Sequence, residues 1–237
     1  MATETTSSIF FQGVRDAAPF ILVVSPFATL FGVVATEAGL DVLAALTFSF
    51  AVIAGAAQFT ALQLMVDQVP VIIVLASALA VNLRMAMYSA ALTPYLGGAP
   101  LWHRALAAYF IVDQSYALSV MRFEENRQWS LRQRLVYFWG TVVPVCPFWY
   151  LFTVVGAVLG EAIPEWMALD FAVPITFIAL IMPMLRTRAH VAAALVSVVA
   201  ALIFAFLPYN LGLFVAGILA MMTGAEVERR TQTEESA

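Results

Sequence analysis

The stretch VIIVLASALAVNLRMAMYSAAL, residues 71–92, is long and apolar enough to cross a lipid bilayer as a single helix. Inside it lies Asn82-Leu83-Arg84, a polar run that carries a full positive charge. An arginine at the centre of a membrane helix disfavours insertion by about 2.5–3.5 kcal/mol on insertion scales. Ionisable residues at that depth usually serve a ligand, a proton or a buried partner. Arg84 is therefore the starting point for both the fold and the functional site.

The composition of the whole chain is that of a membrane protein. Its 237 residues are 63% hydrophobic and 11% charged, with a mean hydropathy of +0.93. Soluble domains are roughly half apolar and about a quarter charged. The composition therefore predicts an all-α integral membrane protein whose surface faces the lipid bilayer. No basic patch exists outside the loops, which argues against nucleic-acid binding. The single cysteine, Cys146, excludes an internal disulfide framework, and two histidines are too few for a histidine-rich metal site. We therefore expect neither a metal site nor a cofactor.

Apolar runs of about 20 residues predict seven to eight transmembrane helices, several of them broken by proline or glycine. These spans are predicted at residues 18–36, 42–64, 70–92, 104–121, 135–160, 167–185, 190–207 and 209–223. The positions of the first and last predicted spans divide the chain into three parts. Residues 1–17 form an N-terminal segment, with a short amphipathic helix at the membrane interface over residues 9–17. Residues 18–223 form the polytopic transmembrane domain, and residues 224–237 form a polar C-terminal tail.

The loops predict the orientation of the spans. With eight spans, every arginine of the loops and tails except Arg104 falls on one side of the membrane. The positive-inside rule makes this side cytoplasmic, so both termini are predicted to be inside the cell. The loop at residues 65–70 fits less well, because it is predicted to be cytoplasmic and has no arginine.

A short motif in the first span recurs in the fifth. PFATLFGVV at residues 26–34 matches PFWYLFTVV at residues 147–155 in its proline, aromatic and valine positions. The match predicts a two-fold internal repeat with halves at residues 18–121 and 135–223. Four spans in each half make the repeats parallel, and an odd number would invert them. Secondary transporters often place the substrate site where such halves meet.

A second intramembrane charge, Asp113, lies in the fourth span. If the third span runs outward and the fourth inward, Arg84 and Asp113 are each about 13 Å from the outer edge, at ~1.5 Å per residue. Antiparallel neighbours would then bring the two charges together as an ion pair. Two interpretations stay open: a structural pair that neutralises two buried charges, or a pair that serves a ligand or a proton.

Other polar groups are candidates for the same centre. Gln58 follows Gly55-Ala56-Ala57 and could cap a broken helix or donate to a ligand. Asp170 could be an interfacial residue or the N-cap of a helix that restarts near Pro174. Burial favours the neutral form of a carboxylate, so an intramembrane aspartate can carry a proton. The predicted substrate-binding residues are Arg84, Asn82, Gln58, Asp113 and Tyr116, and the predicted proton-coupling residues are Asp113 and Asp170.

The sequence lacks the motifs that several classes of function require. The sequence has no P-loop for ATP, no GxSxG or HExxH motif for hydrolysis, and no carboxylate ladder for a cation channel. An enzyme is therefore not predicted. One cation, one or two carboxylates and an aromatic-rich interior fit a small zwitterion with an apolar side chain. Two alternatives stay open, a channel for small solutes and a non-transporting structural subunit of a membrane complex.

The chain resembles the AzlC family of inner-membrane permeases, the large subunits of branched-chain amino acid exporters. The resemblance is carried most specifically by GAAQF at residues 55–59 together with NLR at 82–84 and YSA at 88–90. It extends to the motifs Phe11-Gln12-Gly13, Arg15, Pro19, Phe31-Gly32, Asp113, Tyr116-Ala117, Leu169-Asp170-Phe171-Ala172, Pro174 and Phe177.

The resemblance implies a function that spacing alone does not supply. It implies efflux of branched-chain or similar small apolar amino acids across the cell inner membrane. The intramembrane carboxylate Asp113 adds the expectation that this efflux is coupled to protons. The resemblance also implies a small AzlD-type membrane subunit as a partner. One departure concerns the charge centre: the family often has an acid directly after the equivalent of Asp113, and this chain has Gln114 there. That departure argues against a proton relay between two adjacent carboxylates.

Overall fold

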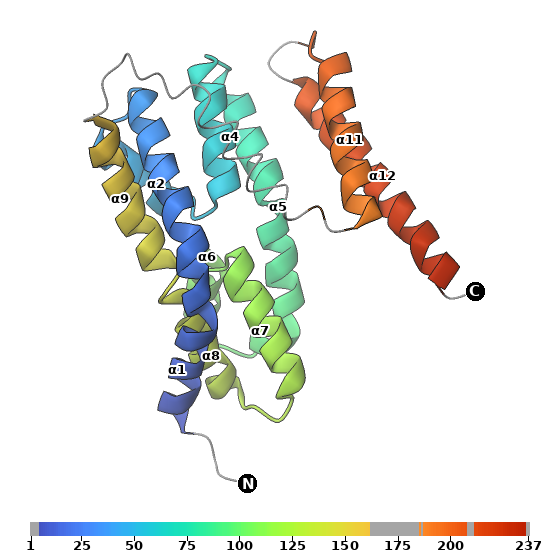
Figure 1. Cartoon of the computed structure of the whole chain (residues 1–237). Helices are drawn as coiled ribbons and strands as arrows, with labels where there is room; N and C mark the ends of the chain where they lie inside the picture. The colour runs from blue at the N-terminus through green and yellow to red at the C-terminus, as the bar shows by residue number, and fades with distance from the viewer. Residues whose placement is uncertain (1–4, 162–184, 186, 208–210, 236–237) are drawn as a thin grey trace. The chain divides into compact units, whose positions relative to one another are not determined.

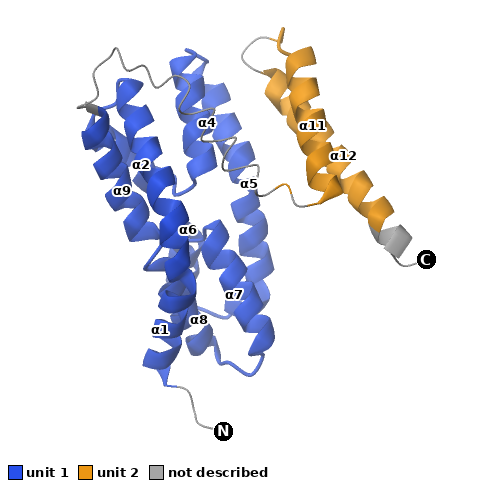
Figure 2. Cartoon of the chain, in the orientation of Figure 1, with its two compact units in different colours: residues 1–167 blue, residues 168–237 orange. Residues whose placement is uncertain are grey.

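The computed structural model describes residues 5–161, 185, 187–207 and 211–235, and all the regular elements in these ranges are helices. The chain divides into two compact units, residues 1–167 and residues 168–237 (Figures 1 and 2). Residues 167–184 of the span predicted at 167–185, Asp170 among them, lie outside the described residues. The all-helical class predicted from the sequence is confirmed for the described part of the chain.

Three long helical segments form the frame of unit 1. They are α1 (Thr6–Ala17), which continues through the 3-10 turn η1 (Ala18–Phe20) into α2 (Ile21–Glu37), then α5 (Val71–Leu96), and finally α8 (Leu131–Val142) followed by α9 (Cys146–Glu161). Each is long and apolar enough to cross a membrane. Proline fits the first turn of a helix, and Pro19 lies in the turn between α1 and α2. The helix predicted to lie at the interface, residues 9–17, is thus continuous with the first span.

Between the first two frame segments the chain makes a helical hairpin. Helix α3 (Val42–Ala51) is followed by the non-helical residues 52–54, of which Val52 and Ala54 are extended, and then by α4 (Gly55–Val66). Gln58 Nε2 donates a hydrogen bond of 3.0 Å to Ser49 Oγ. Nine residues in one continuous helix would span about 13 Å, so the chain must fold back at the break. We call α3, the break and α4 hairpin 1, and its break the tip.

A second hairpin follows α5. Helix α6 (Leu101–Tyr109) ends before residues 110–112, and α7 (Asp113–Glu125) begins after them. Along α5 and α7, Tyr88 stacks on Tyr116 and Tyr95 contacts Phe123, so the two helices run in the same direction. Helix α6 follows α5 after a short turn and must therefore run the opposite way. We call α6, the break and α7 hairpin 2.

The two hairpins enter unit 1 from opposite ends. Hairpin 1 starts where α2 ends, and hairpin 2 starts where α5 ends (Figure 1). Gly98, after α5, lies next to Leu131, the first residue of α8, which confirms that these loops share one end. An arm of 10 or 12 residues spans about 15–18 Å, roughly half of a ~30 Å hydrocarbon layer. Both tips therefore lie near the middle of the bundle.

The folding back corrects the predicted course of the chain. The second and fourth predicted spans, 42–64 and 104–121, are each two short helices that return to the end they came from. The described residues contain four helices long and apolar enough to cross a membrane, and the predicted count of seven to eight is not confirmed. Hydropathy reports the length of an apolar run and not its direction, so a continuous span and a hairpin look alike.

Charge separates along the bundle once the hairpins are placed. Apart from Arg84, the arginines of unit 1 lie toward the end where α1 and α8 begin, which we call the arginine end. Arg104, predicted on the opposite side, belongs to this end because α6 starts there. Glu37, Asp41 and Asp67 lie at the other end. The loop after α4, predicted to be cytoplasmic without an arginine, is at this second end.

Helices α2 and α9 pack face to face through small residues. Gly32 of α2 lies against the backbone of Thr153, and Gly156 of α9 lies against the backbone of Thr29. Close backbone approach at small residues is how membrane helices gain packing energy. Helices α1 and α8 meet in the same way at Gly13 and Gly140. The motif pair at 26–34 and 147–155 thus lies on helices in direct contact, while the repeat itself stays a prediction.

Replacing Gly156 with alanine should destabilise the bundle. A Cβ at this position would lie 2.8 Å from Thr29 Cα, so the backbones of α2 and α9 would have to separate. Overpacking of this kind typically destabilises by about 1–3 kcal/mol. Thermal unfolding in detergent should show a lower midpoint for Gly156→Ala. The matched control is Gly217→Ala in α12, where a Cβ has open space. Equal midpoints for both variants would contradict this account of the contact.

Unit 2 contains an antiparallel helix pair. Helix α11 (Arg188–Ile203) begins with the Thr187 side chain accepting from the backbone N–H of His190 at 3.2 Å, an N-cap. Helix α12 (Leu211–Glu235) returns along it, with Gly212 against Phe204 and Gly224 next to Ala193. The helix continues beyond the predicted end of the last span at residue 223, so the predicted polar tail is helical through residue 235.

Candidate functional site

The two intramembrane charges form an ion pair. Arg84 Nη1 lies 3.2 Å from Asp113 Oδ2. The predicted contact between these residues is therefore confirmed, although it joins helices that run in parallel and not the antiparallel spans from which it was predicted. The side chains are 34% and 45% exposed in the chain by itself. The pair is accessible, and it is not sealed in a core.

The break in hairpin 2 places Asp113. Val112 is extended, and its N–H donates to Ser115 Oγ at 3.0 Å, so Ser115 closes the start of α7. Asp113 is the first residue of that helix. A carboxylate in the first turn of a helix interacts favourably with the positive end of the helix dipole. The local sequence thus holds Asp113 at the tip, facing α5.

One buried nitrogen and one buried oxygen of the ion pair have no hydrogen-bond partner in the described part of the chain. Arg84 Nε and Asp113 Oδ1 are buried atoms without a hydrogen-bond partner among the described residues. Buried polar groups are usually satisfied, and an unpaired one destabilises by about 1–3 kcal/mol. A ligand with both an anionic and a cationic group would satisfy both atoms. That is the chemistry of an amino acid backbone.

Two tyrosines flank the pair. Tyr116, one turn after Asp113, stacks on Tyr88 with ring centroids 4.1 Å apart and an interplanar angle of 11°. Tyr88 also interacts with the Asp113 carboxylate. The sequence interpretation placed Tyr116 in the site and missed Tyr88. The missed signal was spacing, because Tyr88 lies four residues after Arg84 and so on the same face of α5.

Gln58 belongs to a different set of contacts. It is fully buried, and its bond to Ser49 extends to α9, because Ser49 Oγ lies 3.1 Å from Thr153 Oγ1. Thr153 Oγ1 in turn donates to the carbonyl of Trp149 at 2.9 Å. Gln58 therefore ties the arms of hairpin 1 to each other and to α9, and no hydrogen bond joins it to Arg84 or Asp113. Its Oε1 atom has no hydrogen-bond partner within the described ranges.

The remaining predicted site residues are not joined to the pair. Asn82 Oδ1 is buried and has no hydrogen-bond partner in the described part of the chain. Asp170 lies outside the described residues, so its predicted role stays a prediction. No group of acidic, histidine or cysteine side chains that could hold a metal ion occurs among the described residues.

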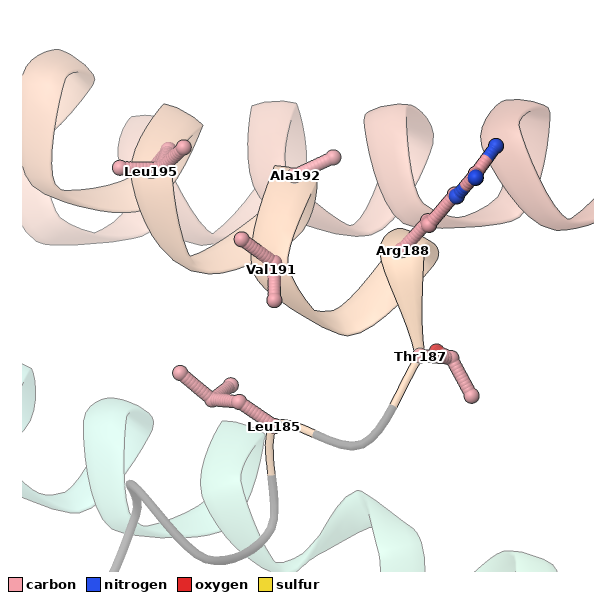
Figure 3. Close-up of a pocket in the computed structure, with 6 residues that line it drawn as sticks. All are labelled: Leu185, Thr187, Arg188, Val191, Ala192 and Leu195. Atoms are coloured by element: carbon pink, nitrogen blue, oxygen red, sulfur yellow. The ribbon is translucent and has the colours of Figure 1, made fainter.

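Unit 2 has a shallow hollow of about 440 Å³ at the start of α11 (Figure 3). None of the predicted site residues lines it. Its lining is mostly aliphatic and consists of Leu185, Thr187, Arg188, Val191, Ala192 and Leu195. One cation beside aliphatic side chains gives the hollow no defined chemistry.

Comparison with known proteins places this arrangement in a family. The chain is 26% identical over 203 residues to the inner membrane protein YgaZ of Escherichia coli, covering 82% of this chain and 81% of that protein. It is 27% identical over 224 residues to an uncharacterized membrane protein of Archaeoglobus fulgidus, covering 93% and 94% of the two chains. No solved structure matches the chain. A family model described as AzlC protein matches residues 19–163, which include both hairpins, Arg84 and Asp113. The chain belongs to the AzlC family.

Proposed function

We propose that the protein is a secondary transporter that exports branched-chain or similar small apolar amino acids across the inner membrane. The observation that carries the proposal is the half-exposed Arg84–Asp113 pair at the tip of hairpin 2, in which Arg84 Nε and Asp113 Oδ1 have no hydrogen-bond partner among the described residues. Broken helices at membrane depth are characteristic of transporter substrate sites. Family membership and the membrane-protein relatives support a transport-related role.

The proposed mode of binding uses both charges. The substrate carboxylate binds the Arg84 guanidinium, where charge-assisted hydrogen bonds are strong. The substrate ammonium binds Asp113 Oδ1, which the ion pair leaves free. Tyr88 and Tyr116 provide an aromatic wall for the aliphatic side chain. Asn82 and Gln58, which are not joined to the pair, are proposed as further hydrogen-bond acceptors through Asn82 Oδ1 and Gln58 Oε1, which have no partner among the described residues.

Three further features complete the proposal. Asp113 carries a coupling proton when the substrate leaves, with Asp170 as a second carrier. A small AzlD-type subunit assembles with the chain in the bilayer. The arginine end faces the cytoplasm, in line with the positive-inside rule. Each of these is a separate hypothesis from the substrate class.

Transport by the purified protein tests the proposed substrate class. The protein, with and without the neighbouring AzlD-type subunit, is reconstituted in liposomes that contain labelled leucine, and efflux is followed with and without a pH gradient. We expect saturable efflux that unlabelled valine and isoleucine inhibit and that glutamate and arginine do not. Efflux that does not saturate would favour a channel, and efflux equal to that of empty liposomes in both preparations would refute the proposal.

A further inference from the structure

The tips of the two hairpins meet at a tyrosine. Tyr109, the last residue of α6, donates a hydrogen bond from its hydroxyl to the carbonyl of Phe50 at 2.6 Å. The same hydroxyl lies 3.3 Å from the hydroxyl of Tyr150 on α9. The Phe50 ring stacks on the Tyr150 ring, with centroids 4.2 Å apart. Three separate elements, α3, α6 and α9, thus come together at one hydroxyl.

The carbonyl of Phe50 needs this partner because of the break in hairpin 1. The last carbonyls of a helix have no partner inside that helix, and α3 ends at Ala51. Water satisfies such carbonyls at a protein surface, but hydrocarbon does not. Hairpin 2 therefore supplies the donor for a group that folding of hairpin 1 leaves unsatisfied.

The other polar contacts of the hairpins lead to different frame helices. Ser49 ties hairpin 1 to Thr153 of α9. Asp113 ties hairpin 2 to Arg84 of α5. Tyr109 contacts Phe50, the residue that follows Ser49. It is also only four residues before Asp113, on the opposite side of the break at residues 110–112.

We propose that Tyr109 is a positioning residue that couples the two hairpin tips and thereby sets the position of Asp113 against Arg84. The inference rests on the proposed transport function for the role of Tyr109, and on the contacts of its hydroxyl with Phe50 and Tyr150 for the geometry. Tyr109 acts through the break at 110–112 and does not contact the substrate. Loss of its hydroxyl releases the two tips from each other, which slows the transport cycle and leaves the substrate-binding charges in place.

Transport kinetics test the role. In liposomes, Tyr109→Phe keeps the ring and removes the hydroxyl. We expect the maximal rate of leucine efflux to fall about five- to twentyfold, with a change in KM of less than about twofold. Tyr95→Phe is the matched control, because its hydroxyl makes no hydrogen bond within the described ranges, and it should keep the wild-type rate. A raised KM at an unchanged maximal rate would assign Tyr109 to the substrate and overturn the proposal, as would kinetics equal to wild type.

Thiol labelling tests the geometry without any transport. The only native cysteine, Cys146, is buried and is replaced by alanine. A cysteine is then introduced at Ile53, in the tip of hairpin 1. Tyr109→Phe should raise the labelling rate at this position several-fold, and Tyr95→Phe should leave it unchanged. No rise refutes the coupling even if leucine transport is confirmed, and a rise supports it even if leucine proves to be the wrong substrate.

Tyr150→Phe is the second variant, for the case that Tyr109→Phe does not fold. If Tyr109→Phe does not accumulate as monodisperse protein, Tyr150→Phe removes only the longer of the two contacts. We then expect labelling at position 53 to rise about twofold. An unchanged rate in that variant would overturn the proposal.

Discussion

Arg84→Ala should reduce leucine efflux at least about tenfold. In the proposed site, the guanidinium is the group that binds the substrate carboxylate, and hydrogen bonds to charged groups contribute about 1.5–3 kcal/mol. Each 1.4 kcal/mol corresponds to a tenfold change in affinity. The variant also leaves Asp113 without its cation, which adds to the loss. Efflux from liposomes measures the loss of transport, and ligand-dependent thermal shifts measure the loss of substrate binding.

Two further variants show whether the loss is specific to the guanidinium of Arg84. Arg104→Ala removes an exposed arginine at the arginine end and should transport like wild type. Arg84→Lys keeps the charge and loses the planar fork that fits a carboxylate, so its activity should lie between those of Arg84→Ala and wild type. Full efflux by correctly folded Arg84→Ala would remove Arg84 from the substrate site.

Exchanging the two charges should not restore transport. If the pair only neutralises two buried charges, Arg84→Asp with Asp113→Arg would recover both stability and efflux. In the proposed site the order of the charges matters, because Asp113 begins a helix whose positive end favours an acid and not a base. We expect efflux at least about tenfold below wild type in the double variant, and unfolding temperatures no lower than those of the single variants.

The control for this experiment lies on the same helix. Glu124→Gln changes an exposed carboxylate of α7 and should leave efflux and stability unchanged. Asp113→Asn, which keeps the shape and removes the charge, should lose efflux to a similar degree as Arg84→Ala. Wild-type efflux by the exchanged pair would assign a structural role to Arg84 and Asp113 and would favour a search for the substrate site elsewhere.

The contact between Arg84 and Asp113 could be predicted from the sequence, because opposite charges inside a membrane usually form an ion pair. The path that brings them together could not. A straight crossing and a hairpin place Asp113 at a similar depth, so the prediction was right about the pair and wrong about the relative direction of the two helices that carry it. Depth alone does not distinguish these two paths.

The two breaks differ in how visible they are in the sequence. Gly55 marks the tip of hairpin 1, and the broken second stretch was expected there. The break at residues 110–112 contains neither proline nor glycine and was not predicted. Its only local sign is Ser115, whose hydroxyl accepts from the backbone of Val112. The bond can be recognised only once the preceding residues are known to be extended.

The distribution of arginines in the sequence already indicated the two hairpins, which the count of apolar spans did not. Arg104 and the loop after α4 were the two places where the predicted orientation disagreed with the arginine distribution. Both disagreements disappear when the second and fourth stretches fold back. An isolated violation of the positive-inside rule can therefore indicate a hairpin that returns to its own side.

The short arms of the hairpins constrain the order in which the protein can be made. Neither α3, with 10 residues, nor α4, with 12, is long enough to enter a bilayer as an independent span. Thr153, which binds Ser49, is synthesised about a hundred residues after it. Hairpin 1 must therefore wait near the membrane surface until the ribosome has delivered α9, so the buried polar contacts of its tip are the last part of unit 1 to be completed.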